Sequence, residues 1–278
     1  DSNVHCIAIK GSFDDCQNLM KSVFGDLAFK EDLRLGAINS VNWARVMAQI
    51  VYYGYISLRF ADGCCFSVPT GNFGNVFAAY IAKRMGFPID KLIVATNEND
   101  ILHRFFDSGD YSRGETHFTL SPAMDIQVAS NLERYLYYRT DCDSARVGRF
   151  MAEFANSGKA TMEGMLTDEP FCSATVKKGE MLDALRSVKQ NSKYLLDPHS
   201  AVGYAAANRF VKKLSLPVVT VATAHPAKFP EAIKQAGIDP VAVHQKLEVL
   251  KDLPTQREVF SADEVLVKDF IKRHARGV

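Results

Sequence analysis

The segment PTGNFGNV at residues 69–76 decides the fold class of this chain, because it stands where an apolar strand passes into a helix. Residues 64–68, CCFSV, are short and apolar, as in a buried strand. Residues 75–85 carry a helical pattern that stops before a Gly and a Pro, and a second apolar strand is expected at 91–96. A strand, a helix and a strand in this order predict a βαβ unit with parallel strands.

The same alternation of strands and helices extends in both directions from this unit. Further strands are expected at 4–9 and 216–223. Helical patterns cover residues 12–24, 37–55, 122–138, 144–207 with breaks, 230–237 and the stretch from 262 onward. The predicted fold class is α/β, a twisted, mostly parallel sheet with helices on both faces. In such sheets ligands bind beyond the carboxyl ends of the strands, so the turns that follow strands should carry the chemistry.

The 278 residues suffice for one large domain or two small ones. The patterns suggest an α/β core segment at 1–143, a mainly helical insertion at 144–212, and the last core strand with C-terminal helices at 213–278. The 33 basic and 32 acidic side chains nearly cancel, which argues against nucleic acid or a charged membrane surface as the main partner. No run approaches the roughly 18 apolar residues of a membrane span.

Cysteine and histidine usage indicates neither a metal site nor a disulfide framework. The six cysteines form no C-x-x-C pair, and the seven histidines form neither an H-E-x-x-H motif nor a helical pair, so no metal is predicted. Inert thiols fit a reducing compartment, and we predict a cytoplasmic protein. The first residues lack a basic and apolar leader, so no signal peptide is expected there.

The glycine loop, residues 71–75, is the strongest candidate for a binding site. Its two glycines let the backbone approach a ligand, and the following helix adds its positive N-terminal end, which suits a phosphate. The loop is not a P-loop, because the Gly-Lys-Ser/Thr ending is absent, and it is not the dinucleotide-binding fingerprint. A plain tight turn without a ligand remains the alternative on these residues alone.

A second group of candidates combines a helix start with a cation. Asn39 and Ser40 are suited to begin a helix, and Arg45 follows about one and a half turns later. Two short polar side chains and a guanidinium near a helix N-terminus can hold an anion. An ordinary N-cap with a solvated arginine has the same spacing, and spacing alone favours it.

A third group follows the strand expected at 216–223. The hydroxyl of Thr223 would face the crevice at the strand end, and His225 could serve as an acid or base. A histidine at such a position more often caps the next helix or binds backbone, and the same two readings apply to His199.

Six segments together resemble the threonine synthase family, in its bacterial and fungal branch. They occur in the family's order and spread over most of the chain, so they are far more specific together than any one motif. The segments are GSFDDCQ (11–17), GAINSVNWAR (36–45), SVPTGNFGN (67–75), SPAMDI (121–126), DPHSAVG (197–203) and ATAHPAKF (222–229). The resemblance implies the tryptophan synthase β-like fold of type II pyridoxal phosphate (PLP) enzymes, with its N-terminal part missing.

The resemblance also implies an activity, a cofactor and residue roles. Family members are PLP-dependent carbon–oxygen lyases that convert O-phosphohomoserine and water to threonine and phosphate, in threonine biosynthesis. The cofactor-binding residues implied are Gly71, Asn72, Phe73, Gly74 and Asn75 at its phosphate and Thr223 at its pyridine nitrogen. The residues implied to hold the substrate's phosphate are Asn39, Ser40 and Arg45. A small-molecule substrate and a monomer or homodimer are expected.

The resemblance covers roughly the last three-fifths of a family member, so the Schiff-base lysine and a substrate loop would lie outside this chain. Lys30, in LAFKE at 27–31, copies the lysine motif in letters only and is expected to be a solvated lysine in a surface connection. No catalytic residue is therefore predicted here, and the chain is expected to be inactive alone. Two alternatives stay open: another PLP lyase of this fold type, and a non-catalytic threonine synthase-like protein.

Overall fold

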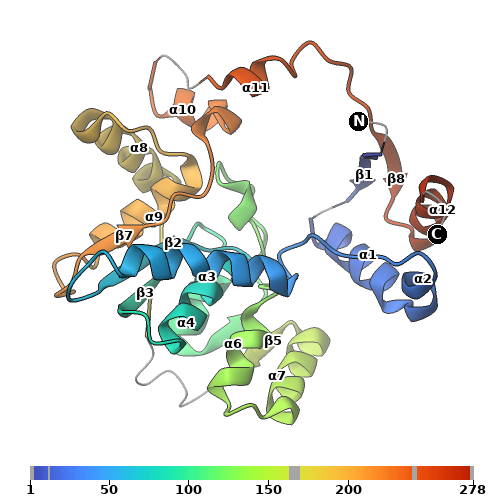
Figure 1. The fold of residues 1–278 in the computed structure, drawn as a ribbon, viewed down its shortest axis with the longest axis horizontal. Helices are drawn as coiled ribbons and strands as arrows, with labels where there is room; N and C mark the ends of the chain where they lie inside the picture. The colour runs from blue at the N-terminus through green and yellow to red at the C-terminus, as the bar shows by residue number, and fades with distance from the viewer. Residues whose placement is uncertain (1–2, 12, 163–169, 240–242, 276–278) are drawn as a thin grey trace. The chain divides into compact units, whose positions relative to one another are not determined.

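The computed structural model describes residues 3–11, 13–162, 170–239 and 243–275. The chain forms two compact units, one from Asn39–Leu247 and one from Asp1–Ile38 with Glu248–Val278. The boundaries expected after residues 143 and 212 both fall inside the larger unit, so that three-part division stays a prediction. Element labels are those of Figure 1.

A four-stranded parallel sheet forms the centre of the larger unit. Its strand order is β6-β3-β2-β7, and every neighbouring pair is parallel. The strands are β6 (Phe171–Thr175), β3 (Ile89–Thr96), β2 (Cys64–Pro69) and β7 (Val218–Thr220). Every residue of β2 is buried, as expected for a parallel strand between helical layers, and burial raises the pKa of the Cys64 thiol to about 11.

Helices cover both faces of this sheet (Figure 1). They are α3 (Trp43–Ser57), α4 (Gly74–Arg84), α5 (Ile101–Ser108), α6 (Leu132–Arg139), α7 (Ser144–Ser157), α8 (Lys178–Ser192), α9 (Pro198–Asn208) and α10 (Pro230–Gln235). Side chains alternate along β3: Leu92 and Val94 join a core with α3 to α7, whereas Ile93 and Ala95 join a core with α8 to α10. The α/β class with helices on both faces is confirmed.

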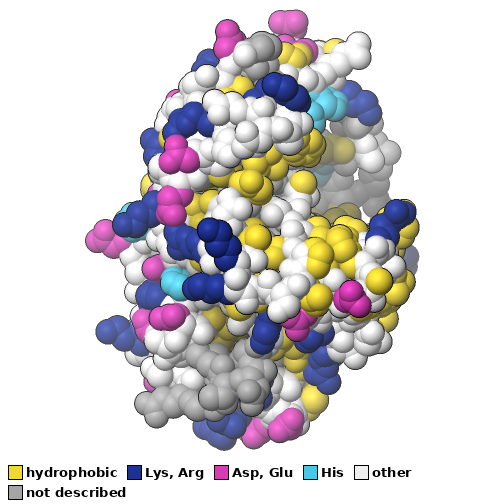
Figure 2. All heavy atoms as spheres, turned by 90° about the vertical axis from the view of Figure 1, so that its left-hand side faces the viewer, with side chains coloured by type: hydrophobic (Ala, Val, Ile, Leu, Met, Phe, Trp, Pro, Cys, Tyr) yellow, Lys and Arg dark blue, Asp and Glu magenta, His cyan; other side chains and the backbone are white. Residues whose placement is uncertain are grey.

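Short elements complete the larger unit. They are the antiparallel pair β4 (Asp110–Ser112) and β5 (Lys159–Thr161), the 3-10 helices η1 (Pro122–Met124) and η2 (Pro226–Lys228), and α11 (Gln245–Glu248) at its end. On the face drawn in Figure 2, basic and acidic side chains are interspersed. No helix among the described residues is long and apolar enough to cross a membrane.

The smaller unit pairs the two ends of the chain. Strand β1 (Ile7–Lys10) lies parallel to β8 (Glu258–Ser261). Its helices are α1 (Phe13–Gly25), α2 (Leu27–Asp32) and α12 (Glu264–His274). Lys30 lies within α2 and is half-buried, so the connection expected after the first helix contains a short helix of its own. The reason is Asp26, whose carboxylate accepts the Phe29 N–H (3.0 Å) and caps a separate short helix.

The helix predicted over 122–138 is wrong as a single element. Only η1 and α6 are helical, and residues 125–131 connect them irregularly. The Asp125 carboxylate accepts hydrogen bonds from the Asn97 amide (2.7 Å) and the Thr119 N–H (2.8 Å). These long-range bonds hold the connecting segment in a non-helical path, which the local pattern could not show.

Two other elements are shorter than expected. The helix predicted over 37–55 begins at Trp43, because Asn42 caps it by accepting the Ala44 N–H (2.8 Å). Asn39 and Ser40 therefore form the turn before the helix, not its start. The strand predicted at 216–223 is only the three residues of β7. Ser12, where the helix predicted over 12–24 begins, lies outside the described residues.

Candidate functional site

The glycine loop connects β2 to α4 and leaves the start of that helix without a side-chain cap. The N-cap residue is Phe73, whose φ of 65° lies in the left-handed region and whose side chain makes no capping hydrogen bond. The first amides of an α-helix have no partner within the helix. The N-terminus of α4 therefore offers backbone donors and a positive dipole end to an anion.

Packing explains how a bulky residue tolerates the left-handed conformation, which costs about 1–2 kcal/mol. The buried ring of Phe73 lies 5.8 Å from the rings of Phe106 and Tyr135 and 5.9 Å from that of Phe171, between centroids. Full burial of a Phe side chain contributes about 1.5–3 kcal/mol, which offsets the strain. The aromatic core thus imposes the loop conformation.

The structure brings Ser40 and Arg45 to the glycine loop. A cavity of about 120 Å³ is lined by these two residues, by Gln49 and by residues 69–75. Arg45 lies in the first turn of α3, closer to the helix start than its spacing from Asn39 suggested, and its side chain is exposed. A guanidinium, a hydroxyl and a helix N-terminus therefore converge on one small cavity, and all three suit a phosphate.

Asn39 does not line this cavity in the structure. Its Oδ1 accepts the Ser40 hydroxyl (2.9 Å) and the Val41 N–H (3.2 Å). These bonds close the turn that presents Ser40, as asparagine commonly does in turns. A direct contact between Asn39 and a substrate stays a prediction.

Asn131 joins the two sequence motifs, and sequence reasoning missed it. It is fully buried, and its side-chain Nδ2 donates to the carbonyls of Asn72 (3.0 Å) and Ser40 (3.2 Å). Arg134 supports it by donating to Asn131 Oδ1 (2.8 Å) and to the Val41 carbonyl (2.6 Å). Within the helix expected over 122–138, Asn131 carried no local signal that its side chain would bind carbonyls of two distant segments.

Thr223 lies on the wall of a second cavity, of about 540 Å³, that adjoins the first, because Gln49 and Asn75 line both. The backbone N–H of Thr223 donates to the Ser200 hydroxyl (3.0 Å), which fixes the turn after β7. The glycine loop and Arg45 therefore line one cavity and Thr223 lines the adjoining one; that the two cavities form one ligand site stays a prediction.

Two tyrosines of α3 fix the side chain of Asn75. Asn75 Oδ1 accepts the Tyr52 hydroxyl and the Tyr53 hydroxyl (2.9 Å). Burial raises the pKa of Tyr52 to about 12 and that of Tyr53 well above its usual value, so both remain donors at neutral pH. The two tyrosine hydroxyls hold the Asn75 oxygen, so the donors left for an anion beside Asn75 are its backbone N–H and its side-chain NH₂.

The two candidate histidines lie outside the lining of these two cavities. His225 is exposed and caps η2, since its Nδ1 accepts the Ala227 N–H (3.2 Å), which is the structural alternative considered for it. His199 is buried, with Nδ1 2.8 Å from Asp197 Oδ1. Neither arrangement places an imidazole as an acid or base in the site.

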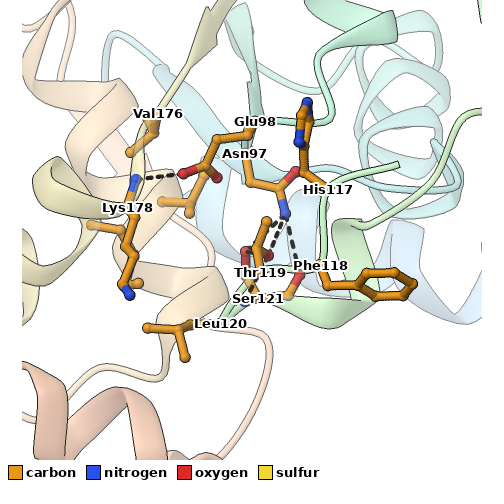
Figure 3. A pocket seen from close by; sticks show the side chains of 11 residues that line it. Asn97, Glu98, His117, Phe118, Thr119, Leu120, Ser121, Val176 and Lys178 are labelled. Carbon is orange, nitrogen blue, oxygen red and sulfur yellow. Dashed lines mark hydrogen bonds between the residues drawn. The ribbon is translucent and has the colours of Figure 1, made fainter. Parts of the chain in front are cut away.

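A third cavity, of about 310 Å³, lies beyond the carboxyl ends of β3 and β6 (Figure 3). Asn97 points its amide at the hydroxyls of Thr119 (2.9 Å) and Ser121 (3.0 Å), and Glu98 accepts the Lys178 N–H (2.7 Å). These hydrogen bonds stabilise the loop at 117–125 and the start of α8.

Comparisons with known proteins agree with this geometry. Residues 200–271 match the family model described as threonine synthase, C-terminal. The threonine synthase of Pseudomonas aeruginosa is 43% identical over 279 residues, covering 98% of this chain and 60% of that protein. The PLP-bound threonine synthase structure from Brucella melitensis matches with a TM-score of 0.86 at 44% identity, over 99% of this chain and 61% of that one.

A second solved structure, threonine synthase from yeast, matches with a TM-score of 0.84 at 36% identity, over 99% of this chain and 60% of that one. These structures confirm the expected type II PLP fold. The chain spans about three-fifths of the length of these relatives. Order of motifs, fold and site geometry lead to one conclusion: the chain belongs to the threonine synthase family.

Proposed function

We propose that this chain carries the phosphate-binding half of a threonine synthase active site. The reaction would convert O-phosphohomoserine and water to threonine and phosphate, with PLP as cofactor. The observation that carries the proposal is the single cavity lined by the glycine loop, Ser40 and Arg45. Two phosphates, one of the cofactor and one of the substrate, need more cation and N–H donors than a plain turn offers.

The residues present fit PLP. The uncapped N-terminus of α4 and the left-handed Phe73 form a backbone cradle for the cofactor phosphate. Gly71 allows close packing there, because a Cβ at that position would lie 2.4 Å from the carbonyl oxygen of Ala123. Thr223, on the adjoining cavity, would face the pyridine nitrogen. The Brucella melitensis relative is described as PLP-bound, which supports this assignment.

Each residue would contribute by binding and orientation. PLP, when bound, supplies an electron sink for the substrate. The Thr223 hydroxyl can accompany a neutral ring nitrogen, because a hydroxyl, unlike a carboxylate, does not hold a proton on it. Arg45 and Ser40 would hold the substrate's phosphate and align it as the leaving group.

The amine that carries PLP in family members would come from outside these residues. Lys30, the lysine in the look-alike motif, belongs to α2 of the smaller unit and not to the unit that contains the glycine loop. Because the resemblance places the family's lysine N-terminal to the segments found here, we propose that no lysine of this chain holds the cofactor and that the chain alone makes no threonine. A cytoplasmic location and a monomer or homodimer complete the proposal.

The proposal is tested by adding PLP to this chain and to the protein that its whole gene encodes. The amide signals of residues 71–75 should shift in NMR spectra of both, and only the whole-gene protein should release phosphate from O-phosphohomoserine. Borohydride trapping followed by peptide mapping should label no lysine within this chain. Labelling of Lys30 together with phosphate release by the chain alone would show that the active site is misplaced.

Two other results would select the alternatives. Turnover of an unphosphorylated amino acid, with no response to O-phosphohomoserine, would indicate another PLP lyase. PLP binding with no turnover by the whole-gene protein would indicate a non-catalytic family member.

A further inference from the structure

The buried carboxylate of Asp197 connects two walls of the proposed site. Asp197 is the N-cap of α9, and its side chain is fully buried. Its Oδ1 lies 2.8 Å from His199 Nδ1 and also accepts the His199 backbone N–H (3.0 Å). Its Oδ2 accepts the Ser200 hydroxyl and the Ala224 N–H (3.3 Å). The two carboxylate oxygens therefore begin two chains of hydrogen bonds, which run in different directions.

The first direction leads to the glycine loop. Nε2 of His199 accepts the Ala123 N–H (3.2 Å), so the ring proton is on Nδ1 and is donated to Asp197. The carbonyl of the same Ala123 abuts the loop, since a Cβ on Gly71 would lie 2.4 Å from its oxygen. The position of Ala123 therefore limits where Gly71 can lie.

The second direction leads to Thr223. The Ser200 hydroxyl donates to Asp197 and accepts the Thr223 N–H (3.0 Å). Together with the bond from Ala224, this holds the backbone that carries the Thr223 hydroxyl. Helix capping alone needs only the contact with the His199 N–H, so the remaining bonds require another explanation.

We propose that Asp197, His199 and Ser200 are positioning residues that set the separation between the glycine loop and Thr223, the two walls that would hold PLP. This inference rests on the proposed function, in which PLP reaches from one wall to the other. A satisfied, buried polar network is stiff, which suits residues that hold a site at fixed geometry.

The charge of Asp197 supports this role. Burial by itself would raise the pKa of Asp197, but hydrogen bonds from His199 and Ser200 outweigh burial and the pKa is lowered. The carboxylate therefore stays ionised near neutral pH and makes charge-assisted hydrogen bonds in both directions.

Two substitutions in the whole-gene protein loaded with PLP test the two directions separately, one toward Thr223 and one toward the glycine loop. Ser200→Ala removes the acceptor for the Thr223 N–H, so the absorption band of bound PLP should shift while its ³¹P signal stays in place. His199→Asn keeps a donor toward Asp197 but loses the acceptor for the Ala123 N–H, so the ³¹P signal should shift and the band should not. His199→Asn should weaken PLP binding about fivefold, as expected for one neutral hydrogen bond. Ser200→Ala should weaken it more, because it also removes the charge-assisted bond to Asp197.

Ser57→Ala is the matched control, because Ser57 is also fully buried and its hydroxyl donates one hydrogen bond, to the Gly54 carbonyl (3.1 Å). It should lower the melting temperature and leave both PLP signals unchanged. Ser200→Thr keeps the hydroxyl and should restore the absorption band. If His199→Asn fails to fold, the comparison of Ser200→Ala with Ser200→Thr decides.

The possible failures are distinguishable. Ser200→Ala and His199→Asn proteins that behave like Ser57→Ala would show that the cluster only caps α9, and would overturn this inference while the proposed function stands. Absence of any bound ³¹P signal in the unsubstituted protein would overturn both.

Discussion

Helices α8 and α4 both begin just beyond a parallel strand of the same sheet, but they differ in how the backbone N–H groups of their first turns are capped. Helix α8, after β6, is capped twice: Glu98 accepts the Lys178 N–H (2.7 Å) and Glu180 accepts the Lys177 N–H (3.0 Å). Helix α4, after β2, has no side-chain cap and no acidic residue in its first turn. The α8 start therefore supplies its own anions, whereas the α4 start has none.

The surroundings of the two helices reinforce this difference. Arg45 and Ser40 line the cavity at α4, so positive charge is added to an already positive helix end. Glu98 and Lys178 both line the cavity at α8, so the carboxylate offsets the ammonium charge there. The contrast teaches that a helix N-terminus is a candidate phosphate site where the protein leaves its donors unused and adds a cation that no neighbouring carboxylate offsets.

The largest effect is expected from Gly71→Ala. The new Cβ would lie 2.4 Å from the backbone oxygen of Ala123, which cannot move like a flexible side chain, so overpacking should cost about 1–3 kcal/mol of unfolding free energy. PLP binding should fall with it, because the loop must shift. Urea unfolding and PLP titration measure the two effects.

Gly179→Ala, in α8, is the matched control for this change. A Cβ there meets no described atom within 4 Å, and Ala is the better helix former, so stability should stay equal or rise by up to about 1 kcal/mol. Equal behaviour of the two substitutions would mean that the glycine loop is not tightly packed.

Arg45→Ala should have the next largest effect, on substrate binding. Loss of one charge-assisted contact to phosphate corresponds to about 10- to 100-fold weaker binding of O-phosphohomoserine. Because Arg45 is exposed, the loss should shrink as salt concentration rises. Steady-state kinetics of the whole-gene protein at two salt concentrations measure this.

Arg59→Ala is the corresponding control, because Arg59 lies just past the end of α3 and stacks on Tyr55, with its guanidinium 4.4 Å from the ring centroid. It should leave the Michaelis constant unchanged. If Arg59→Ala raised the Michaelis constant as much as Arg45→Ala does, the effect of Arg45 would come from the net charge of the protein and not from a contact with phosphate.

The smallest expected effect tests the comparison between the starts of α8 and α4. Replacing Glu98 and Glu180 by Gln removes both carboxylates from the start of α8, so inorganic phosphate should begin to shift the amide signals of residues 177–180. Affinity should be weak, on the order of millimolar, because no arginine comparable to Arg45 lines this cavity. Phosphate shifts at residues 177–180 in the unsubstituted protein would contradict the role given to the two carboxylates.

Much of the fold could be predicted from short-range patterns. The strand at 64–68, the helix that follows it and the strand at 91–96 agree with β2, α4 and β3 to within a few residues. Apolar periodicity and glycine placement act over one or two turns of chain, so they are visible without tertiary contacts. The same holds for the glycine loop, whose position between strand and helix is a local property.

The parts that could not be predicted depend on bonds between distant segments. Asp125 binds Asn97 and interrupts the helix expected over 122–138, and Asn131 then binds carbonyls of Ser40 and Asn72, 91 and 59 residues away. No pattern within one segment indicates which polar side chain will be buried against another segment.

The sequence by itself determined the α/β class, because strand and helix patterns are local. It also predicted the glycine loop as an anion site with Arg45 and Thr223 as its companions, from local patterns and from a family resemblance. The tertiary structure alone decided which residues hold these parts together. Asn131 joins the turn at Ser40 to the glycine loop. Asp197 joins Ala123, which abuts that loop, to Thr223 through His199 and Ser200. The physical reason is burial: a polar group removed from water must find a partner, and only the folded chain shows which partner is near.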